Sequence, residues 1–112
     1  MDDATQLTVD VELVAVQDSE AIRETLADLK PRLAAEYHVR ELGIFGSYAR
    51  DEQTVGSDLD VIVAFDEPVS LFDLVRLEDE LASHLGVDVD LVTKDSLKPR
   101  IRDHVADDVV YV

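Results

Sequence analysis

Four stretches of the chain carry the hydrophobic patterns of β-strands, at residues 7–13, 42–45, 61–65 and 87–92. The first and the last alternate apolar and polar residues, which is typical of a strand with one face on the core and one in solvent. Residues 61–65 are apolar throughout, which predicts a central strand covered on both faces. The apolar tail at 109–112 predicts a further short segment that docks at an edge of the sheet.

Apolar residues at helical spacing predict helices between these strands. The first follows Asp18 and Ser19, which can cap it. Its apolar positions recur every three or four residues as far as Tyr37. Pro31 lies inside this pattern, and because proline removes a helical hydrogen bond we expect it to kink or split the helix.

Two more helices are expected further along the chain. Ser70 can cap one of them, and Gly86 can end it as a C-terminal glycine. The other is expected over 95–105, and residues 48–50 look like the start of a short helix. Strands that alternate with helices predict an α+β (α/β) domain built around one sheet.

Length and composition narrow the class of protein. The 112 residues fit one domain. The net charge of −16 excludes a protein that binds nucleic acid through an overall positive charge. The absence of cysteine excludes disulfides, thiolate zinc sites and a cysteine nucleophile. No apolar run approaches the length of a membrane span, and the N-terminus lacks the pattern of a signal peptide, so we expect a cytoplasmic protein.

The acidity also has a physical interpretation. Asp+Glu number 26 and Lys+Arg only 10, so the folded chain repels itself at low salt. Salt screens such repulsion, with a Debye length of about 3 Å at 1 M. We therefore expect a halophilic source, the alternative being an ordinary acidic protein.

The candidate chemistry lies in the aspartates. Two Asp-x-Asp pairs occur, Asp58/Asp60 and Asp88/Asp90, but composition alone would produce roughly 2.5, so the pattern itself carries no information. Asp58 and Asp60, however, directly precede the apolar strand, where side chains two apart share a face. Two such carboxylates repel each other unless a cation neutralises them, and carboxylate oxygens suit Mg²⁺. Asp90 completes the cluster if the strands are neighbours; otherwise it is an exposed acid on a polar strand face.

A glycine–serine pair could bind phosphate near these acids. Gly46 and Ser47 follow a strand, where a glycine permits close backbone approach and free N–H groups bind phosphate. Arg50 is the only Lys or Arg between Glu41 and Val75, so it is either the cation that meets a phosphate or a surface arginine. Tyr48 either packs under the turn or stacks on a base.

Taken together, these motifs resemble the signature of the minimal nucleotidyltransferases, a branch of the polymerase-β-like superfamily. That signature is Gly-Ser, ten residues and then Asp-x-Asp, here Gly46-Ser47 and Asp58-Leu59-Asp60, with Asp90 at the position of the third aspartate. The resemblance covers roughly residues 20–112. It implies a nucleotidyltransferase fold, with a small mixed sheet and helices on one side. It also implies one domain over 1–112, with a core at 19–112 and a strand extension at 1–18.

The resemblance assigns roles to the motif residues. Asp58, Asp60 and Asp90 would be catalytic and would hold two Mg²⁺ ions on ATP, and Gly46, Ser47 and Arg50 would bind the nucleotide. Asp51 stands where the family often has glycine, and aspartate tolerates a positive φ moderately well.

The resemblance further indicates MntA-type antitoxins, which transfer AMP from ATP to a tyrosine hydroxyl of a HEPN-type RNase toxin. On this interpretation the partners are ATP and the toxin, with no nucleic acid and no membrane, and the oligomeric state of the complex stays open. One alternative is an antitoxin that neutralises its toxin by binding alone. A further alternative is a small-molecule nucleotidyltransferase, although the chain has no second domain to build such a pocket.

Overall fold

The computed structural model describes residues 18–97, 105 and 107–112. The predicted strand at 7–13 and most of the predicted helix at 95–105 therefore lie outside the described residues. The described elements are α2 (Ser19–Tyr37), β1 (Val39–Phe45), β2 (Leu59–Phe65), α3 (Leu71–Leu85), β3 (Val89–Thr93), the 3₁₀ helix η1 (Lys94–Ser96) and β4 (Val110–Tyr111).

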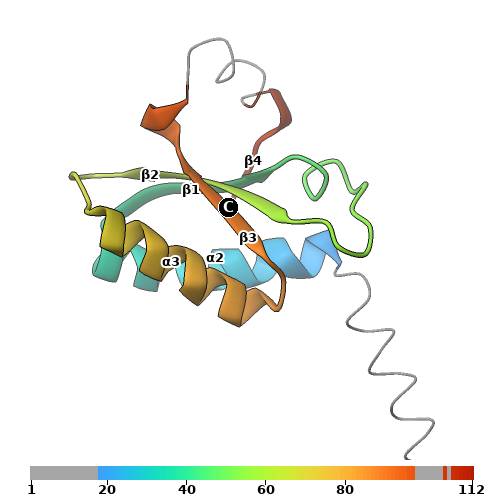
Figure 1. The fold of residues 1–112 in the computed structure, drawn as a ribbon, viewed down its shortest axis with the longest axis horizontal. Coiled ribbons are helices and arrows are strands. Elements are labelled where there is room, and N and C mark those ends of the chain that lie inside the picture. Colours follow the sequence, from blue (N-terminus) through green and yellow to red (C-terminus); the bar gives the residue numbers. More distant parts are fainter. Residues whose placement is uncertain (1–17, 98–104, 106) are drawn as a thin grey trace, which may run out of the picture.

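The four strands form one mixed sheet in the order β3-β2-β1-β4. β2 and β3 are parallel, whereas β1 is antiparallel to both of its neighbours, β2 and β4. Figure 1 shows α2 and α3 on the same side of this sheet. The predicted fold class is therefore confirmed, and so is the docked edge at the C-terminal tail, which forms β4.

α2 begins and extends as its sequence predicts, except at Pro31. Asp18 caps the helix by accepting a hydrogen bond from the backbone of Glu20. The helix runs without interruption through Pro31, so the prediction of a split is wrong. Leu26 and Leu33 are fully buried on either side of the proline, and their burial offsets the lost hydrogen bond.

α3 has both of its predicted ends. The Ser70 side chain accepts a hydrogen bond from the backbone of Asp73, and Gly86 closes the helix in the left-handed conformation at φ 71°. A non-glycine residue in this conformation would be strained, which explains the glycine. The buried residues of α3 are Leu77, Leu81 and Leu85.

The two faces of the sheet differ in character. Leu42 and Ile44 of β1 and Leu59, Val61 and Val63 of β2 belong to the core cluster that includes the buried leucines of both helices. The alternate residues point to the other face. On that face β2 is also covered, since Ile62 is 3% and Ala64 5% exposed, as its unbroken apolar run predicted.

Candidate functional site

Asp60 and Asp90 stand directly opposite each other in the parallel ladder of β2 and β3. Asp60 follows Leu59 and precedes Val61, which both face the helices, so its side chain lies on the sheet face without helices. Asp58 precedes β2 by one residue. It stands two positions before Asp60, and side chains at this spacing in an extended chain point to the same face. The sheet thus brings the predicted aspartates to the starts of two adjacent strands.

The surroundings of Asp60 raise its pKa. Burial is the largest cause, followed by the negative charges of Asp90 and Asp58, whereas the positive charge of Arg50 acts in the opposite direction. Asp90, Asp58 and Arg50 therefore all act electrostatically on Asp60 at this edge of the sheet. The carboxylate of Asp60 is held where its charge is costly, and a cation would relieve that cost.

Gly46 places the chain directly against Asp60. It has φ 74°, which an L side chain rarely adopts. A Cβ at this position would collide with Asp60 Oδ2 and lie 3.2 Å from Asp60 Cγ. Two independent constraints therefore favour glycine at this position: the positive φ of the backbone and the lack of space beside the Asp60 carboxylate.

The segment after Gly46 is a closed turn, so the prediction of a short helix starting at 48–50 is wrong. The backbone N–H of Glu52 donates to the carbonyl of Ser47 at 2.8 Å, and that of Asp51 donates to the carbonyl of Tyr48 at 3.4 Å. This pair of bonds is the Schellman closure that ends a helix. It requires a residue with positive φ, which is Asp51 at φ 58°.

Asp51 has a second role that the sequence did not reveal. The buried hydroxyl of Ser19, at the start of α2, donates a hydrogen bond of 2.8 Å to Asp51 Oδ1. The first turn of α2 is thereby tied to the Gly46–Ser47 turn. No spacing rule predicts this contact, because the two residues are 32 positions apart.

Tyr48 belongs to the core cluster and is 2% exposed. Of the two alternatives left open by the sequence, the ring packs under the turn and is not available to stack on a base. Burial raises the pKa of its hydroxyl. Tyr48 therefore supports the turn from below.

Arg50 lies on the outer surface of the turn and is held by two acids. Its Nε donates to Glu52 Oε1 at 2.8 Å, and its Nη1 donates to Asp108 Oδ2 at 3.0 Å. The hydrogen bond to Glu52, followed by that to Asp108, raises the pKa of the guanidinium. The side chain keeps part of its surface in solvent, and its orientation is fixed by a residue from the end of the chain.

The aspartates fit Mg²⁺ by their chemistry. Within the part of the chain that the structure describes, no three acidic or histidine side chains converge into a ready metal cage. Mg²⁺ does not need one, because it usually binds through one or two carboxylates and completes its octahedron with waters and substrate phosphates. Asp60 and Asp90, opposite each other in adjacent strands beside the Gly46–Ser47 turn, have the chemistry of such a pair.

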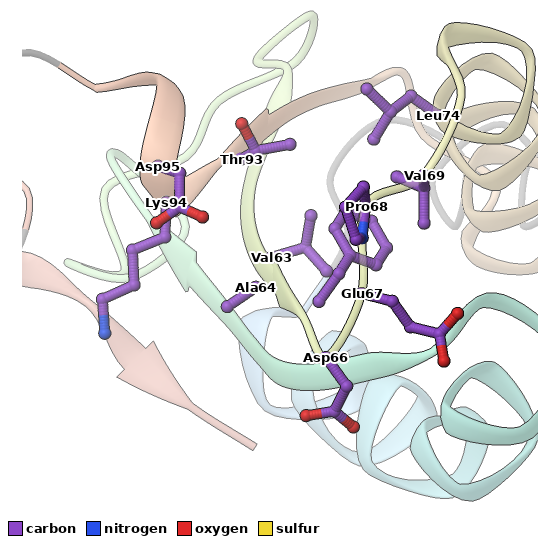
Figure 2. Close-up of a pocket in the computed structure, with 11 residues that line it drawn as sticks. Val63, Ala64, Asp66, Glu67, Pro68, Val69, Leu74, Thr93, Lys94 and Asp95 are labelled. Carbon is purple, nitrogen blue, oxygen red and sulfur yellow. The ribbon is translucent and has the colours of Figure 1, made fainter.

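A separate pocket of about 480 Å³ lies at the opposite end of β2 and β3 (Figure 2). Its walls include Val63 and Thr93 from the ends of the two strands. It does not include any of the predicted site residues.

None of the described helices is long and apolar enough to cross a membrane.

Comparisons with known proteins agree with this geometry. Residues 21–112 match the family model of the nucleotidyltransferase domain. The protein adenylyltransferase MntA of Thermococcus cleftensis is 43% identical over 99 residues, which cover 88% of this chain and all of that protein. A solved structure named as a minimal nucleotidyltransferase is 37% identical with a TM-score of 0.73, covering 84% of this chain and 95% of the other.

A second solved structure is a toxin–antitoxin complex with AMP-PNP. Its matching chain is 26% identical with a TM-score of 0.63, over 85% of this chain and 72% of the other. The fold of this chain thus agrees with the family match. The chain belongs to the nucleotidyltransferase family.

Proposed function

We propose that this protein is a Mg²⁺-dependent adenylyltransferase that transfers AMP from ATP to a tyrosine hydroxyl of a cognate HEPN RNase toxin, and so acts as its antitoxin. The observation that carries the proposal is the register of Asp60 with Asp90, beside a glycine turn that touches Asp60. Two similarities support it: a relative named as a protein adenylyltransferase, and a toxin–antitoxin neighbour with AMP-PNP. ATP and the toxin are then the partners, and the site of action is the cytoplasm.

The proposed reaction is an in-line displacement at phosphorus. The acceptor oxygen bonds to the α-phosphorus of ATP, the bond from that phosphorus to the bridging oxygen breaks, and pyrophosphate leaves with the electron pair. Asp90 lies at the strand edge where it can accept the hydroxyl proton and pass it to water. Two bound Mg²⁺ ions would neutralise charge on the attacking and leaving oxygens. Asp58, Asp60 and Asp90 would hold them.

The turn residues would position the triphosphate. Gly46, whose Cβ side is taken by the Asp60 carboxylate, would present the backbone of the turn to a phosphate, and Ser47 would add a hydroxyl donor. Arg50 would meet a phosphate oxygen with the N–H groups that Glu52 and Asp108 leave unused. Most of the catalysis of such a reaction is positioning and charge stabilisation, which these fixed groups can supply.

The acceptor side of the site is open to a large substrate. Asp58 and Asp90 are exposed, so among the described residues their carboxylates can be approached from solvent. A protein side chain can approach such an edge, whereas a small acceptor would find little to enclose it. This favours the protein acceptor over the small-molecule alternative.

The test is co-expression of the chain with the HEPN-family protein encoded beside it, followed by intact mass measurement of that partner. We expect one or more AMP additions with the wild type and none with Asp58→Asn/Asp60→Asn. The matched control is Asp88→Asn, which removes an exposed carboxylate two residues from Asp90 and should leave the mass gain intact. An unmodified partner that co-purifies with all three versions would instead support neutralisation by binding alone.

A further inference from the structure

The N-terminal part of α3 exposes three large apolar side chains. Phe72 is 83% exposed, Leu71 74% and Val75 50%. They are three of the five exposed large hydrophobic residues in the described part of the chain, and they lie within one helical turn and a half. The burial of Leu77, Leu81 and Leu85 fixes the rotation of α3, so Leu71, Phe72 and Val75 are left outside the core. We call these three residues the α3 patch.

The α3 patch borders the pocket at the ends of β2 and β3. Pro68, Val69 and Leu74 line that pocket and stand immediately before and within the first turn of α3. Figure 2 shows Val63, Thr93 and Leu74 around the hollow. An apolar ridge beside a hollow of about 480 Å³ is the arrangement that receives an anchoring side chain of a protein partner.

The rim of this surface is acidic. Asp66, Glu67 and Asp95 line the pocket. Lys94 is the only cation among the lining residues, and its ammonium donates to Glu41 at 2.9 Å. Arg76 is the one arginine or lysine of α3. A partner that seats an apolar side chain here must therefore carry lysine or arginine around it.

We propose that the α3 patch and its acidic rim dock the protein acceptor of AMP, through an apolar anchor flanked by basic residues. This rests on the proposed function, since it names the surface that holds that substrate. A second copy of this chain is a poor occupant, because a twofold contact would place the same acids against each other in a chain of net charge −16. An anionic membrane is repelled for the same reason.

The distance between Asp60 and the pocket beside the α3 patch, which Phe65 lines, agrees with a docking role. Asp60 and Phe65 are five residues apart along β2, which corresponds to roughly 17 Å at the rise of an extended strand. A mononucleotide bound at Asp60 does not fill that span, but a protein partner does. The patch would therefore set the affinity for the acceptor and leave the chemical step unchanged.

The experiment compares surface variants of the full chain for binding to the neighbouring HEPN-family protein. Binding is measured in the Asp58→Asn/Asp60→Asn background, so that no modification occurs. Leu71→Ser/Phe72→Ser removes the apolar anchor site, and Ala34→Ser/Ala35→Ser is the matched control on the exposed surface of α2. We expect the Kd to rise at least about tenfold for the patch variant and to stay unchanged for the control.

A charge variant tests the rim. Glu67→Lys/Asp95→Lys should weaken binding severalfold at about 0.1 M KCl and much less at about 2 M, because salt screens the contact. Its control, Glu24→Lys/Asp28→Lys, makes the same charge change on α2. The effect of the patch variant should persist at high salt, since apolar contact is not screened.

The outcomes separate the two proposals. If the partner gains no AMP from the wild type while the patch variant still loses affinity, the proposed function fails and the docking surface stands. If AMP is transferred and the patch and rim variants bind as tightly as their controls, the docking proposal is wrong. A patch variant that only dissolves a dimer of this chain, seen by sedimentation, would also overturn it.

Discussion

The carboxylate of Asp60 lies against Gly46, so closely that no side chain can be added to the glycine without moving the aspartate. This contact joins the end of β1 to the start of β2 at the point where the nucleotide would bind. It also makes the glycine a sensitive position for both folding and activity.

Gly46→Ala should therefore lose stability and activity together. The left-handed backbone alone costs an alanine about 1 kcal/mol, and the collision with Asp60 adds to this. Gly56→Ala is the matched control, since Gly56 has φ 88° but nothing within 4 Å of its Cβ position. We expect thermal unfolding to show a similar backbone cost in both variants. AMP transfer should fall about a hundredfold or more in Gly46→Ala only, because small displacements of catalytic groups have effects of this size.

Asp60→Asn should make the protein more stable at pH 7 while it abolishes activity. Burial and the charges of Asp90 and Asp58 disfavour the Asp60 carboxylate, and an amide removes that repulsion. The same change removes a ligand for the metal. Mg²⁺ with a non-hydrolysable ATP analogue should therefore raise the Tm of the wild type and not that of Asp60→Asn. A variant that is no more stable than the wild type without ligand, or a wild-type Tm that the ligand leaves unchanged, would contradict this interpretation of the cluster.

The bond between Ser19 and Asp51 can be tested by a double-mutant cycle. Asp51→Gly suits the positive φ but leaves the buried Ser19 hydroxyl without its acceptor, at a cost of about 1–3 kcal/mol. Ser19→Ala/Asp51→Gly removes both partners and should be at least as stable as Asp51→Gly alone. Asp51→Asn keeps an acceptor oxygen and should remain near the wild type. Urea unfolding of the wild type, Ser19→Ala, Asp51→Gly and the double variant gives the coupling, and a value near zero would refute a structural role for the bond.

The ion pair between Glu41 and Lys94 predicts a pH dependence. The hydrogen bond from Lys94 lowers the pKa of Glu41 below its usual 4.5. A carboxylate with a lowered pKa in the folded state stabilises the protein above its unfolded pKa, and this contribution is lost as the pH falls through the folded value. Glu41→Gln should thus be less stable than the wild type at pH 7, and the difference should disappear at a pH below the lowered folded pKa of Glu41. Glu24→Gln, on the exposed surface of α2, should match the wild type at both pH values.

Much of the fold could be predicted from periodicity, but the contacts between distant elements could not. The apolar run at 61–65 and the caps at Asp18, Ser70 and Gly86 carry local signals that act through the nearest turns of the chain. The helix is not split at Pro31 because packing of Leu26 and Leu33 outweighs the local cost of proline. In place of the short helix expected at 48–50, the chain forms a Schellman turn. This turn depends on the positive φ of Asp51, a backbone conformation that few residue types predict.

The site was predictable to a similar extent. Alternation along a strand predicts that Asp58 and Asp60 lie on one face, and this prediction does not require the partner strand to be known. The pairing of Asp60 with Asp90 depends on the register of two parallel strands joined through α3, which sequence patterns do not specify. The contact of Ser19 with Asp51 and that of Arg50 with Asp108 arise only in the folded chain.

The acidity of the chain predicts stabilisation by salt. With 26 acidic and 10 basic residues, repulsion is screened as the Debye length falls from about 10 Å at 0.1 M to about 3 Å at 1 M. The Tm should therefore rise by several degrees between about 0.1 M and 2 M KCl if the chain is adapted to salt. Salt also strengthens apolar burial, so the charge effect needs its own control. Glu24→Gln/Asp28→Asn/Asp79→Asn removes three exposed acids and should be more stable at low salt with a smaller gain from KCl. Equal gains in both proteins would assign the effect to apolar burial, and a flat Tm would exclude the halophilic interpretation.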